Sequence, residues 1–273
     1  MEIFKIQIIR FFLEPFLLIL THRRLLVNIT YNEIRSRVAG SVLGLLWLVL
    51  YPILLLSAYA FVYIYVFSIR FPIFTTNEYI ALIFCGLIPF IAFADSLSNG
   101  IGAVTNNVSL IKNVIFPIEL IPVKTVIVSQ ITQIVGITLL IIASAFFKRI
   151  SIFLLMLPII WILQIMFTIG VIWVVSSLNV FVRDLQQVIN VLILVLMLIS
   201  PIAYTPEMVP EGMRPLLRIN PLFYIITGVQ DSIIIGRLTE PYLIIAFLFI
   251  AFFFFVFGYH FFIRLKRVFA DNV

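Results

Sequence analysis

Charge is scarce in this chain of 273 residues. Only 11% of the residues are charged, whereas 63% are apolar. A soluble domain has about half apolar and about a quarter charged residues, and a surface built from the present composition would aggregate in water. The composition therefore excludes soluble enzymes, nucleic-acid-binding proteins and disulfide-rich domains. It indicates a polytopic membrane protein with an all-α fold, because helices satisfy their own backbone groups in lipid.

Chemical motifs are equally scarce. The single cysteine, Cys85, lies in an apolar run and is expected to be a small buried side chain. The chain has no H-E-x-x-H motif and no Cys/His spacing typical of a metal site. None of the 11 glycines is followed by lysine, which excludes a phosphate-binding G-x-x-x-x-G-K-[ST] loop. We therefore expect that this chain is not an enzyme and binds no cofactor. If ATP is used, we expect another chain to hydrolyse it.

Six stretches approach the roughly 20 apolar residues that a helix needs to cross a bilayer. They are residues 42–67, 79–104, 122–147, 152–182, 186–204 and 241–263, all approximate. The fourth is long, which indicates tilt or an extension beyond the bilayer, and the fifth is short and runs into Pro201. Residues 42–267 are predicted to form one transmembrane domain, followed by a short tail over 268–273.

Residues 1–41 are too broken by charge to span a membrane. On a helical wheel, Gln7, Arg10, Glu14 and Thr21 lie within about 60° of one another, and the rest of the surface is apolar. This pattern predicts an amphipathic helix that lies along the membrane surface.

The distribution of lysine and arginine predicts the orientation. With both termini in the cytoplasm, twelve of these residues lie on the inner side and six on the outer side, as the positive-inside rule requires. Asp95 then lies toward the cytoplasmic end of the second span, where we expect an interfacial carboxylate rather than a proton relay.

Two irregular segments interrupt the spans. In residues 105–122, Val108, Ile111 and Ile115 have helical spacing, which is typical of a short amphipathic helix that enters a groove on a cytoplasmic partner or rests on lipid headgroups. Residues 201–221 hold five of the 13 prolines, so the chain must break there. Residues 221–236 then form a short helix, either re-entrant and shielded by protein or lying on the outer surface.

Aromatic residues recur along the first span. Trp47, Tyr51, Tyr59 and Tyr63 are spaced by four or eight residues. Because an unpaired hydroxyl is costly in lipid, Tyr51 and Tyr59 should face other helices or a channel. Aromatic faces stack on sugars, so the stripe suits a carbohydrate path, although the pattern favours packing between helices with the hydroxyls bonded across spans.

Several motifs, taken in order, resemble one family. The chain resembles the permease subunits of type 2 ABC exporters of polysaccharides over about residues 30–268. The matching residues are Arg37 with Ser41–Trp47 and Pro52, Leu110–Pro117, Asn179–Asp184, Ser200–Pro206 and Asn220-Pro221-Leu222.

The resemblance implies a homodimer paired with two ABC ATPase subunits that hold Mg-ATP, in the cytoplasmic (inner) membrane. It implies a lipid-linked polysaccharide substrate, O-antigen foremost and capsule or teichoic acid as alternatives. The implied coupling helix to the ATPase comprises Asn106, Asn107, Val108, Leu110, Ile111, Lys112 and Asn113. The implied outer gate comprises Pro201, Tyr204, Pro206, Asn220 and Pro221.

Two further hypotheses concern the cytoplasmic mouth and the class of protein. Arg35 and Arg37 either steer the pyrophosphate of the lipid carrier or anchor the chain at the membrane surface. An ion-coupled transporter and a membrane-embedded glycan-processing enzyme are the alternative classes. Both would act without an ATPase.

Overall fold

The computed structural model describes residues 2–39, 41–62, 75–107, 116–146 and 151–269. Every regular element in these ranges is helical, which confirms the all-α prediction. Four of the helices are long and apolar enough to cross a membrane.

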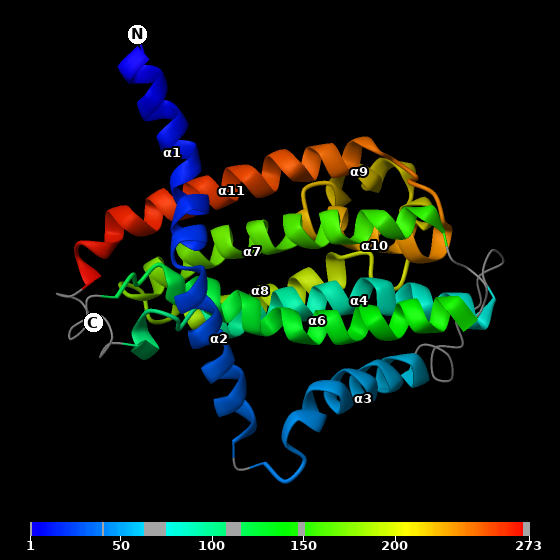
Figure 1. Cartoon of the computed structure of the whole chain (residues 1–273). Coiled ribbons are helices and arrows are strands. Elements are labelled where there is room, and N and C mark those ends of the chain that lie inside the picture. Colours follow the sequence, from blue (N-terminus) through cyan, green and yellow to red (C-terminus); the bar gives the residue numbers. More distant parts are fainter. Residues whose placement is uncertain (1, 40, 63–74, 108–115, 147–150, 270–273) are drawn as a thin grey trace.

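These four helices lie side by side and form the core (Figure 1). They are α4 (Thr76–Gly100), α6 (Leu120–Phe146), α7 (Leu157–Asn179) and α11 (Tyr242–Lys266). The predicted second, third, fourth and sixth spans correspond to them within a few residues at most ends. The long fourth stretch is composite, because the 3-10 turn η4 (Ile152–Met156) precedes α7.

The closest helix pair in the core is α7 and α11. Gly170 and Gly258 meet at their crossing, and a Cβ atom on either would collide with backbone atoms of the opposite helix. Small residues permit this approach between membrane helices. Trp173 on α7 is fully buried and packs against Phe255 and Tyr259 of α11.

Two shorter helices pack on this core. They are α3 (Trp47–Phe61), which follows the turn η1 (Gly44–Leu46) and packs on α6, and α8 (Leu185–Ile199), which packs on α4. The helix in the fifth predicted stretch ends at Ile199, where the helix stop predicted at Pro201 places it, so residues 200–204 of that stretch are not helical. Proline disfavours helical backbone in the residue before it, and Ser200, which precedes Pro201, is extended. At 15 residues α8 is about 22 Å long. Residues 63–67 of the first predicted span lie outside the described residues.

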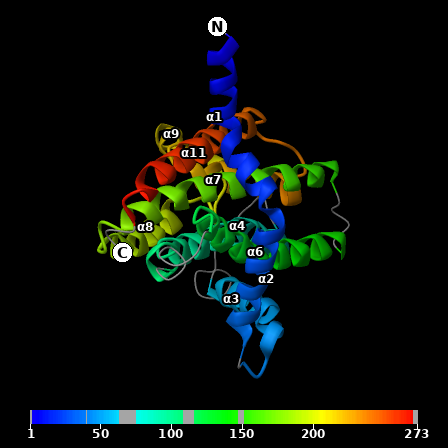
Figure 2. The same ribbon diagram turned by 60° about the vertical axis from the view of Figure 1, so that its left-hand side comes forward.

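The N-terminal region forms two helices rather than one. They are α1 (Glu2–Thr21) and α2 (Arg23–Val38), interrupted at His22. Both run across the long helices near one end of the bundle (Figures 1 and 2). Phe11 of α1 stacks on His260 of α11, with ring centroids 3.6 Å apart.

Residues 200–241 form what we call the proline-rich segment. It contains η5 (Pro206–Met208), η6 (Glu211–Met213), α9 (Arg214–Leu217), α10 (Pro221–Gln230) and the π-helical turn η7 (Asp231–Ile235). The predicted break and the predicted short helix are both confirmed. The segment lies toward one end of the bundle, and the opposite end carries the C-terminus (Figure 1).

Candidate functional site

The end of the bundle where α4 stops and α6 begins is the first candidate region, and we call it the hairpin end. The turn η3 (Thr105–Asn107) extends α4, Asn106 is exposed, and the Asn107 amide donates to the Ala103 carbonyl at 2.9 Å. Five other residues predicted for the coupling helix lie outside the described residues: Val108, Leu110, Ile111, Lys112 and Asn113.

Two ion pairs join α2 to the hairpin end. The Lys124 ammonium of α6 lies 2.8 Å from a Glu33 carboxylate oxygen. The Arg37 guanidinium lies 3.7 Å from the Asp95 carboxylate of α4, which also accepts a hydrogen bond of 2.7 Å from Asn99. Asp95 is therefore a paired, half-exposed carboxylate, as the sequence predicts.

A third ion pair joins the ends of α11 and α6. Lys266 donates to Glu119 at 2.6 Å, and the Glu119 side chain is only 6% exposed. The other carboxylate oxygen of Glu119 is buried and has no hydrogen-bond partner. Glu119 lies at the N-terminus of α6 and Lys266 at the C-terminus of α11, so each charge also complements its helix dipole.

The predicted aromatic stripe of α3 divides between two environments. The Tyr59 hydroxyl contacts the Met197 sulfur of α8 at 3.6 Å, so Tyr59 faces another helix as expected. Trp47 and Tyr51 are 43% and 53% exposed, so the described part of the chain does not bury them. Tyr63 lies outside the described residues.

The residues of the predicted outer gate come together in the proline-rich segment. The Asn220 amide donates to the Ser200 hydroxyl at 2.8 Å, and its oxygen caps α10 by accepting from the Leu222 N–H at 3.0 Å. Pro221 occupies the first turn of α10, where its missing N–H costs nothing. The Tyr204 hydroxyl donates to the Ile199 carbonyl at 2.6 Å. Pro206 begins the turn η5.

Neutral hydrogen bonds attach this segment to the core. Gln230, 1% exposed, donates to the Pro201 carbonyl at 3.0 Å, and the Tyr79 hydroxyl of α4 donates to the Ala203 carbonyl at 3.0 Å. Gly86 of α4 lets the segment approach closely, because a Cβ atom there would lie 2.8 Å from the Ile202 Cα. The polar residues of α10 and η7 thus face protein, as the shielded-helix prediction requires.

A buried carboxyl group, that of Asp231, lies at the start of η7. Asp231 accepts two hydrogen bonds from Thr239, from the N–H at 2.7 Å and from the hydroxyl at 2.8 Å. Burial raises the pKa of Asp231 to about 6, although both bonds act in the opposite direction. Gly236 then takes a left-handed conformation (φ 69°) and turns the chain toward α11.

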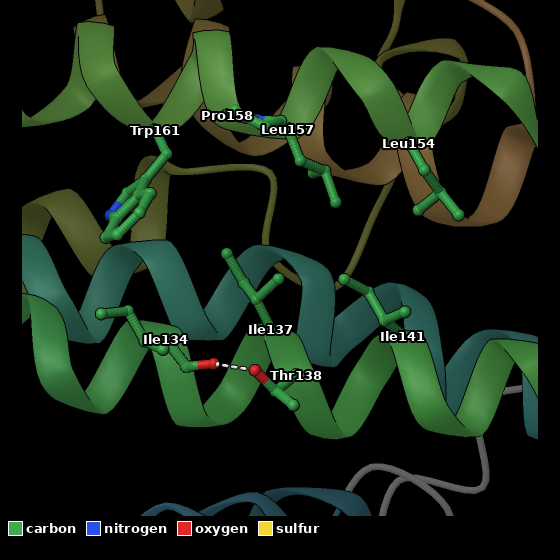
Figure 3. A pocket seen from close by; sticks show the side chains of 8 residues that line it. All are labelled: Ile134, Ile137, Thr138, Ile141, Leu154, Leu157, Pro158 and Trp161. Carbon is green, nitrogen blue, oxygen red and sulfur yellow. Dashed lines mark hydrogen bonds between the residues drawn. The ribbon is translucent and has the colours of Figure 1, made fainter.

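A pocket of about 210 Å³ opens between α6 and the start of α7 (Figure 3). Its lining is almost wholly apolar, and its polar groups are already engaged. The Thr138 hydroxyl donates to the Ile134 carbonyl at 2.7 Å, and the Trp161 indole donates to Gln130 at 2.9 Å. The pocket therefore offers no free polar group to recognise a sugar or a phosphate.

Within the described ranges, no group of three His, Cys, Asp or Glu side chains could hold a metal ion. The described polar residues tie helices together. Long apolar helices, crossing helices at one end and a broken segment near the other are the features of a multi-pass membrane protein.

The comparisons identify the family. Residues 121–234 match the model of the ABC-2 type transporter. The chain is 30% identical to the O-antigen export system permease protein RfbA of Klebsiella pneumoniae over 90% of this chain and 94% of that protein. It is 27% identical to RfbA of Myxococcus xanthus over 80% and 84%, and 27% identical to the polysialic acid transport protein KpsM of Escherichia coli over 77% and 81%. The chain belongs to the ABC-2 transporter permease family, whose members act with a separate ABC ATPase subunit.

Family membership confirms that this chain is a permease subunit rather than an enzyme. The sequence did not single out the ion-pair partners, because Glu33 and Lys124 are 91 positions apart. It also missed Gly86, since a glycine inside an apolar run has no distinguishing pattern. Charges near helix ends were the available signal for the ion pairs, but they had been interpreted as membrane topology, as an interfacial carboxylate at Asp95 and, for Arg37, as a site for the lipid pyrophosphate.

Proposed function

We propose that this chain is the membrane subunit of an ATP-driven exporter that carries a lipid-linked polysaccharide, O-antigen foremost, across the cytoplasmic membrane. The observation that carries the proposal is the similarity to O-antigen export permeases over 90% of the chain. The described structure is compatible with it, since this chain offers helical walls and no described metal site.

The proposed topology has six membrane crossings, with both termini in the cytoplasm. The four long helices supply four crossings, and α3 and α8 extend toward the other two. The hairpin end then faces the cytoplasm. There α1 and α2 cross the bundle, which is the arrangement expected if residues 1–41 lie along the membrane surface (Figure 1). The proline-rich segment would form the outer gate, and residues 268–273 a cytoplasmic tail.

The proposed assembly is a homodimer of this chain with two ATPase subunits that bind Mg-ATP. The apolar face of α8 supports a second copy, because the described residues of this chain leave it uncovered. Its most exposed members are Val188, Val191, Leu194 and Leu198. Trp47 and Tyr51 would then line the path between two copies, where their rings could stack on sugars. Residues 106–114 would dock on the ATPase.

The cytoplasmic mouth is the proposed entry for the lipid pyrophosphate. Arg35 is exposed and is in no ion pair with a described residue, whereas Arg37 is engaged by Asp95. Arg35 is therefore the better placed of the two to meet a pyrophosphate.

Capsular polysaccharide is the second candidate substrate. The similarity to the polysialic acid transport protein KpsM favours it, although at lower identity and coverage.

Export by cells tests the proposal. The chain and an ABC ATPase encoded beside it are expressed in a strain that lacks its own exporter and makes lipid-linked O-antigen. We expect surface glycan to appear with both chains and lipid-linked glycan to accumulate inside with either alone. Tyr51→Ala should reduce export, and Leu54→Ala, an exposed neighbour on α3, should not. Vigorous transport by the permease alone would refute the proposal.

A further inference from the structure

The two ion pairs of α2 reach both stems of one helical hairpin. Arg37 pairs with Asp95 on α4, which leads into the hairpin tip, and Glu33 pairs with Lys124 on α6, which leads out of it. The tip itself, between Asn107 and Phe116, is the segment expected to dock on the ATPase. One helix is therefore linked to both sides of the element that receives the mechanical input.

Packing between α2 and the bundle is incomplete at this place. Leu26 and Thr30 are buried on the inner face of α2. Beyond them a groove of about 330 Å³ opens between α2 and the start of α6, and Glu33 and Lys124 both line it. The remaining lining residues are Ile29, Asn32, Ser36, Phe116 and Ile121. Near the hairpin, polar contacts therefore take the place of close apolar packing.

The two pairs differ in exposure. In Arg37–Asp95 both side chains are 35% exposed, whereas in Glu33–Lys124 the glutamate side chain is 36% and the lysine side chain only 14% exposed. The first pair therefore adds little to stability, but breaking the second would leave a largely buried lysine without its partner. Both pairs fix which surfaces face each other, because a wrong pairing brings like charges together.

We propose that Glu33, Lys124, Arg37 and Asp95 are positioning residues that clamp α2 to both stems of the coupling hairpin. When the ATPase displaces the hairpin tip, the clamp makes α2 move with α4 and α6 and so transmits the displacement to the cytoplasmic mouth. This inference rests on the proposed function, since it requires an ATPase at the tip.

A charge swap in the complete transporter tests the clamp. Permease and ATPase are reconstituted together in liposomes with a lipid-linked glycan, and both glycan transport and ATP hydrolysis are measured. Glu33→Lys and Lys124→Glu should each lower glycan transported per ATP by about tenfold, while copurification of the ATPase is retained. The double swap should restore at least about half of the wild-type ratio, as coupled residues do. Arg10→Glu is the matched control, because Arg10 pairs with Glu14 within α1 and joins no two elements.

A distance measurement reads the clamp without any substrate. Spin labels at Ser36→Cys on α2 and Ser98→Cys on α4 use two exposed positions, and the buried Cys85 remains unlabelled. With ATP, we expect this distance to stay constant while Ser36 moves relative to a label at Gly212→Cys. In the Lys124→Glu variant, the distribution of distances between the labels at positions 36 and 98 should become broader.

The outcomes separate the two hypotheses. Normal coupling in both single variants, or no rescue by the double swap, would overturn the clamp. So would independent motion of Ser36 and Ser98 in the wild-type complex. If the glycan is not transported even by the wild type but the labels move together, the substrate assignment fails and the clamp stands.

Discussion

The proline-rich segment and the hairpin end are attached to the same helical core by different chemistry. Neutral hydrogen bonds from buried side chains such as Gln230 hold the proline-rich segment, together with close contact at Gly86. Ion pairs hold the hairpin end in the described part of the chain; both partners of Arg37–Asp95 are 35% exposed, whereas Lys124 and Glu119 are largely buried. Leaving a buried polar group unpaired costs about 1–3 kcal/mol, whereas an exposed ion pair contributes about 0–1 kcal/mol. The first region is thus fixed by buried contacts, whereas in the second the exposed Arg37–Asp95 contact can break at little cost.

The largest expected effect concerns Asp231 in the proline-rich segment. Its pKa is raised to about 6, so the folded protein binds this proton more tightly than the unfolded chain does. The contribution of Asp231 to stability should therefore be full below about pH 4 and should be lost as the pH rises through about 6, by up to about 3 kcal/mol. Asp231→Asn should remove this fall. Melting in detergent between pH 4 and 7 measures it.

Glu211→Gln is the control for Asp231, because the Glu211 side chain is 89% exposed. This variant should keep the wild-type dependence on pH. An Asp231→Asn protein with the same dependence as wild type would show that Asp231 does not set it.

Gly86→Ala should have the next largest effect. The added methyl group would meet the Ile202 backbone at 2.8 Å, which requires the proline-rich segment to shift. We expect a loss of about 2 kcal/mol, typical of overpacking in a filled core. Gly212→Ala is the matched control, since nothing lies within 4 Å of its Cβ position. Equal melting temperatures of the two variants would contradict the close contact.

Lys266→Met tests the one buried ion pair of the hairpin end. It would leave Glu119 buried without its partner, which costs several kcal/mol in a fully buried pair. Because Lys266 is itself one-third exposed, we expect a smaller loss, about 2 kcal/mol. Arg264→Met, two residues away on the same helix and exposed, should have little effect. If the Lys266→Met protein were as stable as this control, the Lys266–Glu119 pair would contribute as little to stability as an exposed ion pair does.

Local features of the fold were predictable from the sequence, and long-range features were not. Prolines and apolar runs act through the nearby backbone, so the break at Pro201 and the short helix from Pro221 were both predicted. The two-helix N-terminus was not, because no residue near His22 carries a helix-stop signal such as glycine or proline. The hydrogen bond from Gln230 to Pro201 was missed because it depends on how α10 packs.

In the candidate site too, local features were predictable from the sequence and long-range contacts were not. The sequence identified Asp95 as a carboxylate at a helix end, but pairing with Arg37 requires α2 to cross α4. It expected Tyr51 and Tyr59 to face other helices or a channel; among the described residues Tyr59 meets α8, and Tyr51 is 53% exposed. The type of a side chain indicates whether it should lie near the membrane surface or inside the membrane. Which residue it contacts depends on how the helices pack, and the sequence does not give this.

Arg37→Gln should have the smallest effect on stability. The Arg37–Asp95 pair spans 3.7 Å and both side chains are 35% exposed, so its loss should cost less than about 1 kcal/mol. For a chain of this size that corresponds to a shift in melting temperature of at most about 4 °C. High salt should remove the difference from wild type, because screening weakens the pair in the parent protein. If Arg37→Gln instead destabilised the protein as much as Gly86→Ala does, and did so in high salt as well, α2 would be a fixed part of the core. The contrast between a rigid proline-rich segment and an adjustable hairpin end would then be lost.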